Sequence, residues 1–286
     1  MSKSISILDP LYPQDLTKIK KVPENLFYKG DWDCNIFKNC LAVVGSRNGT
    51  EYGRRITKKL VMELAYHGIT IVSGFMYGID SVAHQACVDA GGRTIAVLPY
   101  GIDSKVPEYQ KYLFNEILNY QGLIVSEYAS DLKAQKYTFV ERNRLVVGLS
   151  KAVLVVEGAL NSGTMVTASL AKKFDKPLFA VAGHIDSKVS EGVNNLIKEG
   201  TAEMVTSAKD ILKIFDTTLT VVEDGTNNYA LSPLEKDILN LLQIDSLSLD
   251  DLVLKTKFPA SKLSVSLTTM VLSGYLNEKG GKYYVG

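Results

Sequence analysis

Residues 41–53 read LAVVGSRNGTEYG, a short aliphatic run followed by a glycine-rich loop. Five more apolar runs of strand length follow: ITIVSG at 69–74, TIAVLPYG at 94–101, LIVSEY at 123–128, AVLVVEG at 152–158 and LFAVAG at 178–183. Continuous apolar runs of this kind are typical of parallel strands that are buried on both faces. Longer amphipathic stretches separate them, such as 54–67 with its stripe of Ile56, Leu60 and Leu64. Six strands and five intervening helices predict a doubly wound, mostly parallel α/β fold.

The composition is that of an ordinary globular protein. Of 286 residues, 46% are hydrophobic and 22% are charged, and the formal net charge is only +1. Any nucleic-acid binding must therefore come from a local cluster of cations. The three cysteines, Cys34, Cys40 and Cys87, form no CxxC pair and indicate neither a disulfide framework nor a metal site. Without a signal-peptide core or a run of 18 apolar residues, we expect a cytoplasmic protein that makes no membrane contact.

Changes in composition and in hydrophobic pattern divide the chain into four segments. We expect residues 1–40 to pack on the core as an extended segment and residues 41–215 to form the Rossmann-like domain. Residues 216–230 are rich in Thr, Asn, Asp and Gly, which is typical of a linker. In 231–286, Ser232 and Pro233 start a helix, two more are expected from Ser248 and over 259–272, and Gly280-Gly281 joins two short strands. Three helices and a hairpin predict a small winged-helix domain.

Ligands of a doubly wound sheet bind beyond the carboxyl ends of its strands, so the loops after the apolar runs carry the candidate site. In the first loop, Gly45, Ser46, Arg47 and Thr50 can cradle a phosphate, although a tight structural turn explains the same residues equally well. The spacing is not GxGxxG, and no acidic residue ends the second strand. A dinucleotide cofactor is therefore not expected, and neither is any other cofactor.

The loop after the second strand reads SGFMYGID at 73–80. Ser73, Gly74 and Gly78 let the backbone approach a ligand closely. Asp80 is either the cap of the next helix or a group that orients the loop. His84 lies one helical turn further, which favours a hydrogen bond to Asp80 over a role as a metal ligand or a catalytic base.

The loop after the fifth strand reads VEGALNSGTMVT at 156–167. It has the glycine spacing of a phosphate-binding P-loop, but Thr164 and Met165 stand where the lysine and the magnesium-binding hydroxyl are required. Nucleotide hydrolysis is therefore not expected. The helix that starts here can still bind an anion through Ser162, Gly163, Thr164 and Thr167.

Residues 133–144, KAQKYTFVERNR, combine two lysines, two arginines and two aromatic rings. This mixture is typical of single-stranded DNA binding, although a solvated, basic helix start is the simpler interpretation. On a helix Arg142 shares the face of Leu145 and points toward the crevice. Arg144 lies about 200° round the helix, nearer Glu141, where it is either a ligand or half of an ion pair.

The ordered series YPxxL, VPxxLFYKGD, VVGSRxxTxYG, SGxxxGIDxxAH, GGxTIAVLxxGID, SEY, FxxRNR, VEGxxxSGT and GxNxLIxxGT resembles the DNA-processing protein A family, also called DprA or Smf. The resemblance runs from about residue 11 to residue 213 and implies an extended Rossmann domain that binds single-stranded DNA. It also implies a homodimer that helps to load a RecA-type recombinase during natural transformation and recombination, without catalytic activity of its own. The single-stranded DNA or phosphate-binding positions are then Gly45, Ser46, Arg47, Thr50, Ser73, Gly74, Gly78, Lys136, Phe139, Arg142, Asn143, Arg144, Ser162, Gly163 and Thr164, with Asp80 and His84 orienting the loops.

Three positions depart from the family pattern: SGFMY replaces the usual SGLA, Val140 replaces a proline, and Ala182 replaces the proline of AVPG. The alternative function is a nucleotide-binding enzyme or carrier related to nucleoside-monophosphate phosphoribohydrolases. Their PGGxGTxxE signature is missing, and no carboxylate lies between Met165 and Leu170. The C-terminal segment from Tyr229 carries six basic and six acidic residues, so we expect it to contact protein or to bind DNA weakly.

Overall fold

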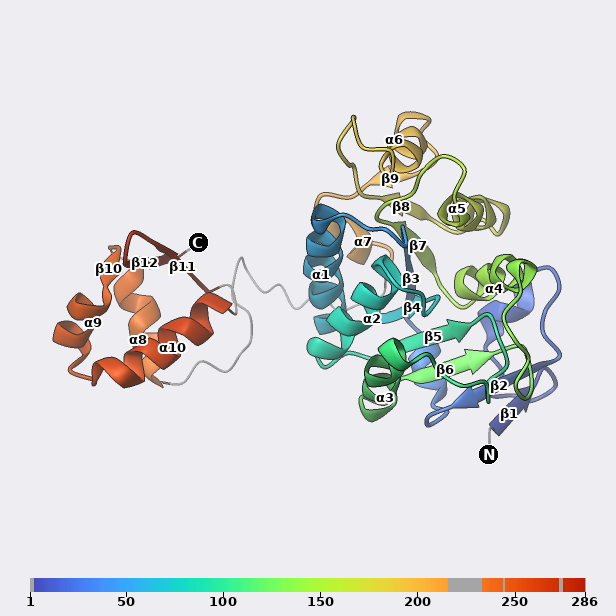
Figure 1. Cartoon of the computed structure of the whole chain (residues 1–286), viewed down its shortest axis with the longest axis horizontal. Helices are drawn as coiled ribbons and strands as arrows, with labels where there is room; N and C mark the ends of the chain where they lie inside the picture. Colours follow the sequence, from blue (N-terminus) through green and yellow to red (C-terminus); the bar gives the residue numbers. More distant parts are fainter. Residues whose placement is uncertain (1–2, 216–232, 244, 273–274, 286) are drawn as a thin grey trace. The chain divides into compact units, whose positions relative to one another are not determined.

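The structure, a computed structural model, describes residues 3–215, 233–243, 245–272 and 275–285 (Figure 1). The chain forms two compact units, Met1–Thr218 and Leu219–Gly286. Each unit is described by itself. The predicted linker at 216–230 and the predicted cap Ser232 lie outside the described residues.

The described part of the first unit is built on one nine-stranded sheet, with the order β1-β2-β6-β5-β4-β3-β7-β8-β9. Its strands are β1 (Lys3–Ser6), β2 (Asn25–Lys29), β3 (Cys40–Val44), β4 (Thr70–Ser73), β5 (Thr94–Leu98), β6 (Leu123–Ser126), β7 (Ala152–Val155), β8 (Leu178–Ala180) and β9 (Glu203–Met204). All neighbours from β6 to β9 are parallel. The six predicted strands are β3 to β8, so the predicted doubly wound sheet is confirmed.

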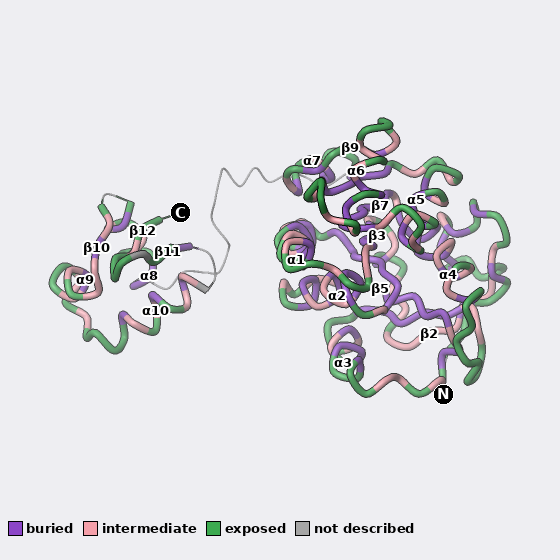
Figure 2. Tube along the Cα trace, turned by 45° about the horizontal axis from the view of Figure 1, so that its top comes forward, coloured by how far each residue is buried: buried purple, intermediate pink, exposed green. Residues whose placement is uncertain are grey.

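Helices cover both faces of this sheet, because alternate residues of a strand point to opposite sides. Of the β3 residues, Cys40, Ala42 and Val44 pack in the cluster that includes α4 and α5, whereas Leu41 and Val43 pack against α1 and α2. Figure 2 shows the buried strands between these two layers. The helices are α1 (Glu51–Tyr66), α2 (Ile79–Asp89), α3 (Lys111–Asn119), α4 (Lys136–Gly148), α5 (Gly163–Lys173), α6 (Glu191–Lys198) and α7 (Ala208–Leu212), with the short 3-10 turns η1 (Gln14–Lys18), η2 (Cys34–Phe37) and η3 (Glu108–Gln110).

The N-terminal segment adds two strands that the sequence analysis did not predict. β1 pairs antiparallel with β2, and β2 pairs antiparallel with β6. Leu16 and Ile19 then pack so closely on α4 that a Cβ on Gly148 would lie 2.8 Å from each of their side chains. The strands gave little signal because they are short and only partly buried, with no continuous apolar run.

The second unit contains α8 (Pro233–Leu242), β10 (Leu247–Ser248), α9 (Leu249–Thr256), α10 (Ala260–Leu272), β11 (Leu276–Lys279) and β12 (Lys282–Val285). The helix predicted from Ser248 is confirmed, and Ser248 is its N-cap, because the Ser248 hydroxyl accepts a hydrogen bond from the N–H of Asp251 at 3.2 Å. At the hairpin, Gly280 and Gly281 have φ of 61° and 74°, the left-handed pair that a type I′ turn requires. The predicted winged helix is confirmed.

Candidate nucleic-acid interface

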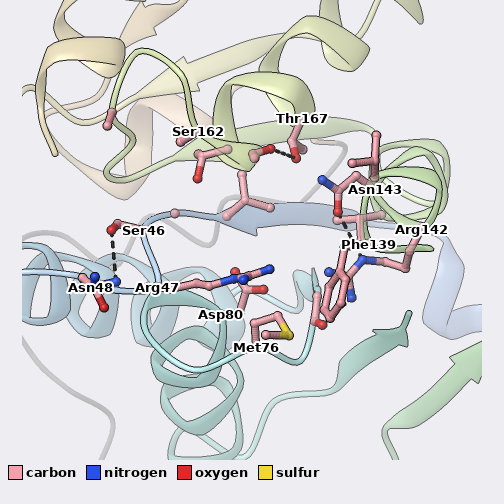
Figure 3. Close-up of a pocket in the computed structure, with 18 of the residues that line it drawn as sticks. Ser46, Arg47, Asn48, Met76, Asp80, Phe139, Arg142, Asn143, Ser162 and Thr167 are labelled. Carbon is pink, nitrogen blue, oxygen red and sulfur yellow. Dashed lines mark hydrogen bonds between the residues drawn. The ribbon is translucent and has the colours of Figure 1, made fainter. Parts of the chain in front are cut away.

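A pocket of about 480 Å³ opens at the carboxyl edge of the sheet, around the ends of β3 and β7. The chain leaves β3 toward α1 on one face and leaves β7 toward α5 on the other, so a crevice forms where the two connections diverge. Figure 3 shows Arg47 and Asp80 on one side of this opening, Ser162 and Thr167 on the opposite side, and Phe139, Arg142 and Asn143 projecting from α4. Four segments of the chain therefore meet around one opening.

Arg142 is fixed inside the wall of the pocket. Its side chain is buried, and its Nη1 donates to the carbonyl oxygens of Gly74 and Val97. Its Nε donates to Oδ1 of Asn143 at 3.2 Å. Burial lowers the pKa of the guanidinium to about 10, so the group keeps its charge at neutral pH. The structure thus holds a positive charge in a rigid position at the end of β4 and β5.

Asp80 shares this wall with Arg142, on the two sides of Gly74. A Cβ on Gly74 would lie 2.6 Å from Nη2 of Arg142 and 2.6 Å from Oδ2 of Asp80, so a larger residue would displace one of them. Burial raises the pKa of Asp80 to about 6, against the opposing effects of Arg142 and of hydrogen bonds from Ser73 and Met76. The N-cap of α2 is Gly78 and not Asp80. Asp80 is therefore bonded to the loop before α2 without being its cap.

Arg47 is an exposed cation of the pocket, as is Lys136. Its guanidinium carbon lies 5.1 Å from the ring centroid of Phe139 and 5.9 Å from that of Tyr77. Both distances are within the range of cation–π attraction. The sequence analysis identified Arg47 and Phe139, but Tyr77 was missed because it lies in a different loop.

The N-terminus of α5 opens into the pocket from the opposite side. Its N-cap is Ser162, whose hydroxyl accepts from the N–H of Met165 at 3.4 Å. Gly163 is exposed, and no atom lies within 4 Å of the place where a Cβ would be. The first N–H groups of a helix have no partner within the helix, and they carry its positive dipole end. This end of α5 is open to an anion.

The N-terminus of α1, in contrast, is occupied by the protein's own carboxylate. The Oγ1 of Thr50 donates to Oε1 of Glu157 at 2.5 Å, and the N–H of Thr50 donates to Oε2 at 2.9 Å. Glu157 is 1% exposed, and a Cβ on Gly53 would lie 2.4 Å from its carboxyl group. The prediction that Thr50 helps to bind a phosphate is therefore wrong, because its donors are already used. Dinucleotide-binding Rossmann folds hold the pyrophosphate at this helix end.

The pocket brings together most of the predicted binding residues. Those that line it are Gly45, Ser46, Arg47, Gly74, Lys136, Phe139, Arg142, Asn143, Ser162, Gly163 and Thr164. Sequence reasoning missed Asn48, Met76, Val140 and Ala159, which also line it. Asn48 and Ala159 are neighbours of predicted residues in the same loops, so the only available signal was their position.

Three further predicted binding residues lie outside the pocket lining. The Ser73 hydroxyl donates to the carbonyl of Val43 at 2.6 Å. Gly78 has φ of 89°, and a Cβ there would lie 2.4 Å from the carbonyl oxygens of Ser46 and Arg47. Both residues fix the loops and do not face the opening. Arg144 forms an ion pair with Glu127, so the ion-pair interpretation is confirmed with a different acid from the expected Glu141.

His84 has a different partner from the one predicted. Its Nδ1 pairs with the hydroxyl of Thr94 at 2.7 Å, and the expected bond to Asp80 is not formed. The side chain is buried, which together with the charge of Arg142 lowers its pKa to about 3. The imidazole is therefore neutral and belongs to the core. A bond from Asp80 was predicted from helical spacing alone, but Asp80 instead faces the loop before its helix.

The described residues show neither a metal-binding cluster nor a membrane-spanning helix. They contain no group of three or more His, Cys, Asp or Glu placed to hold a metal ion. No helix in the described part of the chain is both long enough and apolar enough to cross a membrane.

The match of the sequence to known families decides the assignment. Residues 3–216 match the family described as DNA recombination-mediator protein A, and residues 224–282 match the DprA winged helix domain. The chain belongs to the DNA recombination-mediator protein A family, also called DprA or Smf. It is a DNA-processing protein with the extended Rossmann-like fold of that family and a C-terminal winged helix.

Relatives of this family agree over most of the chain. The DNA processing protein DprA of Streptococcus pneumoniae is 40% identical over 213 residues, which cover 74% of each chain. The Smf protein of Escherichia coli is 39% identical, over 79% of this chain and 60% of its own. The crystal structure of the S. pneumoniae protein superposes with a TM-score of 0.69, at 37% identity over 75% of each chain. The DNA processing protein A of Helicobacter pylori, described for its single-stranded DNA binding mode, superposes with a TM-score of 0.66 at 31% identity, over 74% of this chain and 94% of its own.

Proposed function

We propose that the pocket at the ends of β3 and β7 binds single-stranded DNA. The observation that carries this proposal is that the Arg47 guanidinium lies 5.1 Å from the ring of Phe139 and 5.9 Å from that of Tyr77, at a pocket that Arg142 and the open end of α5 also line. Phosphates need fixed cations and N–H donors, and unpaired bases need flat rings on which to stack. The pocket offers both within one opening. The description of the H. pylori relative, which names single-stranded DNA binding, supports the same ligand.

Glu157 argues against the alternative of a nucleotide-binding enzyme or carrier. A mononucleotide or dinucleotide held in the usual Rossmann manner would need the end of α1 that this carboxylate occupies. Such a protein would also not need the basic and aromatic segment at 133–144. We therefore infer a binding protein that performs no chemistry on its ligand.

We further propose that the bound strand is delivered to a RecA-type recombinase, in the cytoplasm, during recombination or uptake of DNA by natural transformation. The family description, recombination-mediator protein, supports this role. The resemblance in the sequence motifs also implies that the active form is a homodimer. Light scattering on the purified protein tests the homodimer. We expect a molar mass of twice the 31.4 kDa of one chain.

Equilibrium titration tests the DNA ligand. Fluorescent oligothymidylate of about 30 nucleotides and a duplex of equal length are titrated over a salt series with the wild type, Arg47→Ala and Arg142→Ala. We expect a preference for the single strand that both substitutions abolish. Equal binding of the duplex, or binding that ignores both substitutions, contradicts the proposal. Protection against thermal unfolding by nucleotides without any DNA affinity would favour the carrier.

Recombinase delivery has its own test. The rate at which a RecA-type recombinase nucleates on an oligonucleotide coated with single-strand binding protein is measured with and without this protein. We expect faster nucleation with the wild type and no acceleration with Arg47→Ala. An unchanged rate with a DNA-binding wild type would contradict the mediator role alone.

A further inference from the structure

The surface beside the pocket is formed by the loops that follow β5 and β6. β5 pairs with β4, and β6 pairs with β5, so these loops continue the carboxyl edge away from the pocket. They are fixed to each other through their backbones. The N–H of Gly101 donates to the carbonyl of Leu132 at 2.8 Å, and that of Asp103 donates to the carbonyl of Ser130 at 2.8 Å. The two loops form one continuous, well-supported surface.

Tyrosine rings stand exposed along this surface. Tyr109 is 69% exposed and Tyr137 is 59% exposed, so both rings are accessible to a ligand. Tyr137 lies between Lys136 and Phe139 on α4, and both of these neighbours line the pocket. Tyr109 precedes Gln110, whose Nε2 donates to the carbonyl of Phe75 at 2.8 Å. The backbone near each ring is thus tied to a wall of the pocket.

Tyr100 connects Tyr109 to the pocket electrostatically. Burial and then Tyr109 raise the pKa of the Tyr100 phenol to about 12, against the charge of Arg142, which lowers it. Tyr100 therefore lies within electrostatic reach of both Tyr109 and Arg142. Its hydroxyl is buried and has no hydrogen-bond partner among the described residues.

This surface exposes three lysines, Lys105, Lys133 and Lys136, beside the exposed acidic residue Asp131. Every residue from 129 to 137 is exposed, and so is Lys105 in the neighbouring loop. Lys105, Lys133 and Lys136 have no carboxylate within 4 Å in the described part of the chain. Two of the nearby acids have cations of their own: Glu108 lies 2.5 Å from Lys111, and Asp103 lies 3.4 Å from Lys29. The lysines are therefore available to phosphates.

The other side of the pocket exposes one lysine, Lys188, but lacks the aromatic rings. The loops at 158–162 and 183–191 contain no Tyr, Phe or Trp. They expose Leu160 and Ile185, at 48% and 97%, together with the acidic Asp186 and Glu191. A polyanion with stacking bases is better served by the surface at β5 and β6.

We propose that the DNA strand leaves the pocket over the carboxyl ends of β5 and β6, where its bases stack on Tyr109 and Tyr137 and its phosphates face Lys105 and Lys133. This inference rests on the proposed function of the pocket. We call Tyr109, Tyr137, Lys105 and Lys133 the tyrosine surface. The inference predicts that the pocket holds the first nucleotides of the strand and that the tyrosine surface holds the nucleotides that follow. Short strands then use the pocket alone.

Oligothymidylates of about 5 and about 20 nucleotides separate the two parts of the site. For the double variant Tyr109→Ala/Tyr137→Ala we expect at least about fivefold weaker binding of the long strand and unchanged binding of the short one, because stacking on each ring is lost. For Lys105→Ala/Lys133→Ala, the slope of log K against log salt should fall by about 1.4 with the long strand only.

Matched controls use residues at the opposite edge of the sheet. Tyr120 is the C-cap of α3 and is 44% exposed, and Lys38 is an exposed residue just before β3. Tyr120→Ala and Lys38→Ala should leave both strands unaffected. The inference is overturned if the tyrosine variant binds the long strand like the wild type, or if Leu160→Ala/Ile185→Ala weakens it instead. In both cases, loss of single-strand binding in Arg47→Ala would still support the proposed function of the pocket. A wild type that binds neither strand overturns the pocket and the surface together.

Discussion

The N-termini of α1 and α5 follow neighbouring strands of one sheet, yet only one of them is open. At α1 the buried carboxylate of Glu157 accepts both donors of Thr50. At α5 nothing fills the space around Gly163, and Arg47 and Arg142 line the same pocket. The comparison teaches that two neighbouring helix ends of one sheet can differ in access. The protein supplies its own anion at α1 and leaves the end of α5 open, where we propose that the ligand binds.

The largest effect is expected from Arg142→Ala, which removes the fixed charge from the open site. The substitution leaves the carbonyls of Gly74 and Val97 without their donor and removes the cation beside Asp80. We expect a loss of about 3 kcal/mol in the free energy of unfolding, together with loss of single-strand binding. Urea unfolding and DNA titration measure the two effects. Arg47→Ala is the control, because it should lose binding while its stability stays within about 0.5 kcal/mol of the wild type.

Glu157→Ala removes the carboxylate that closes the N-terminus of α1, and so tests the comparison at that helix end. The N–H and hydroxyl of Thr50 lose their acceptor, which should cost about 2 kcal/mol of stability. The freed end of α1 should then bind inorganic phosphate, so that phosphate raises the Tm of the variant more than that of the wild type. Equal phosphate effects on both proteins would show that Glu157 does not close an anion site.

Gly163→Asp makes the open helix end resemble the closed one. A Cβ at Gly163 meets no atom within 4 Å, and an acidic residue in the first turn favours the helix dipole, so the variant should fold with unchanged or slightly higher stability. Its charge should weaken single-strand binding about tenfold. Gly163→Asn is the matched neutral variant. If both variants bind DNA equally well, phosphates do not approach this end of α5.

The smallest effect concerns pH. The pKa of Asp80 is raised from 3.8 to about 6, so the folded protein binds more protons than the unfolded chain between these values, and stability falls as pH rises through this window. Above about pH 6 the carboxylate also repels phosphates, so single-strand affinity should fall by a few-fold between about pH 5 and about pH 8. Asp80→Asn should flatten both profiles. A pH dependence that persists in this variant would assign it to another group.

The sequence predicted most of the sheet and much of the site, because both depend on local patterns. Continuous apolar runs identified β3 to β8, and helical geometry placed Arg142 toward the crevice, where it now lies buried. Two of the failures concern partners that lie far away along the chain. Thr50 is bonded to Glu157, 107 residues on, and Arg144 is paired with Glu127, which follows β6. No periodicity in the sequence records such pairs.

Photocrosslinking tests the central claim most directly, because it identifies the residues that touch the strand. An oligothymidylate that contains 4-thiothymidine is irradiated with the full-length protein, and the crosslinked peptides are identified by mass spectrometry. The account predicts crosslinks to the peptides that carry Tyr77 and Phe139, lost when Arg47 is replaced by Ala. Crosslinks confined to the winged helix, or to the loops at 158–162 and 183–191, would contradict it.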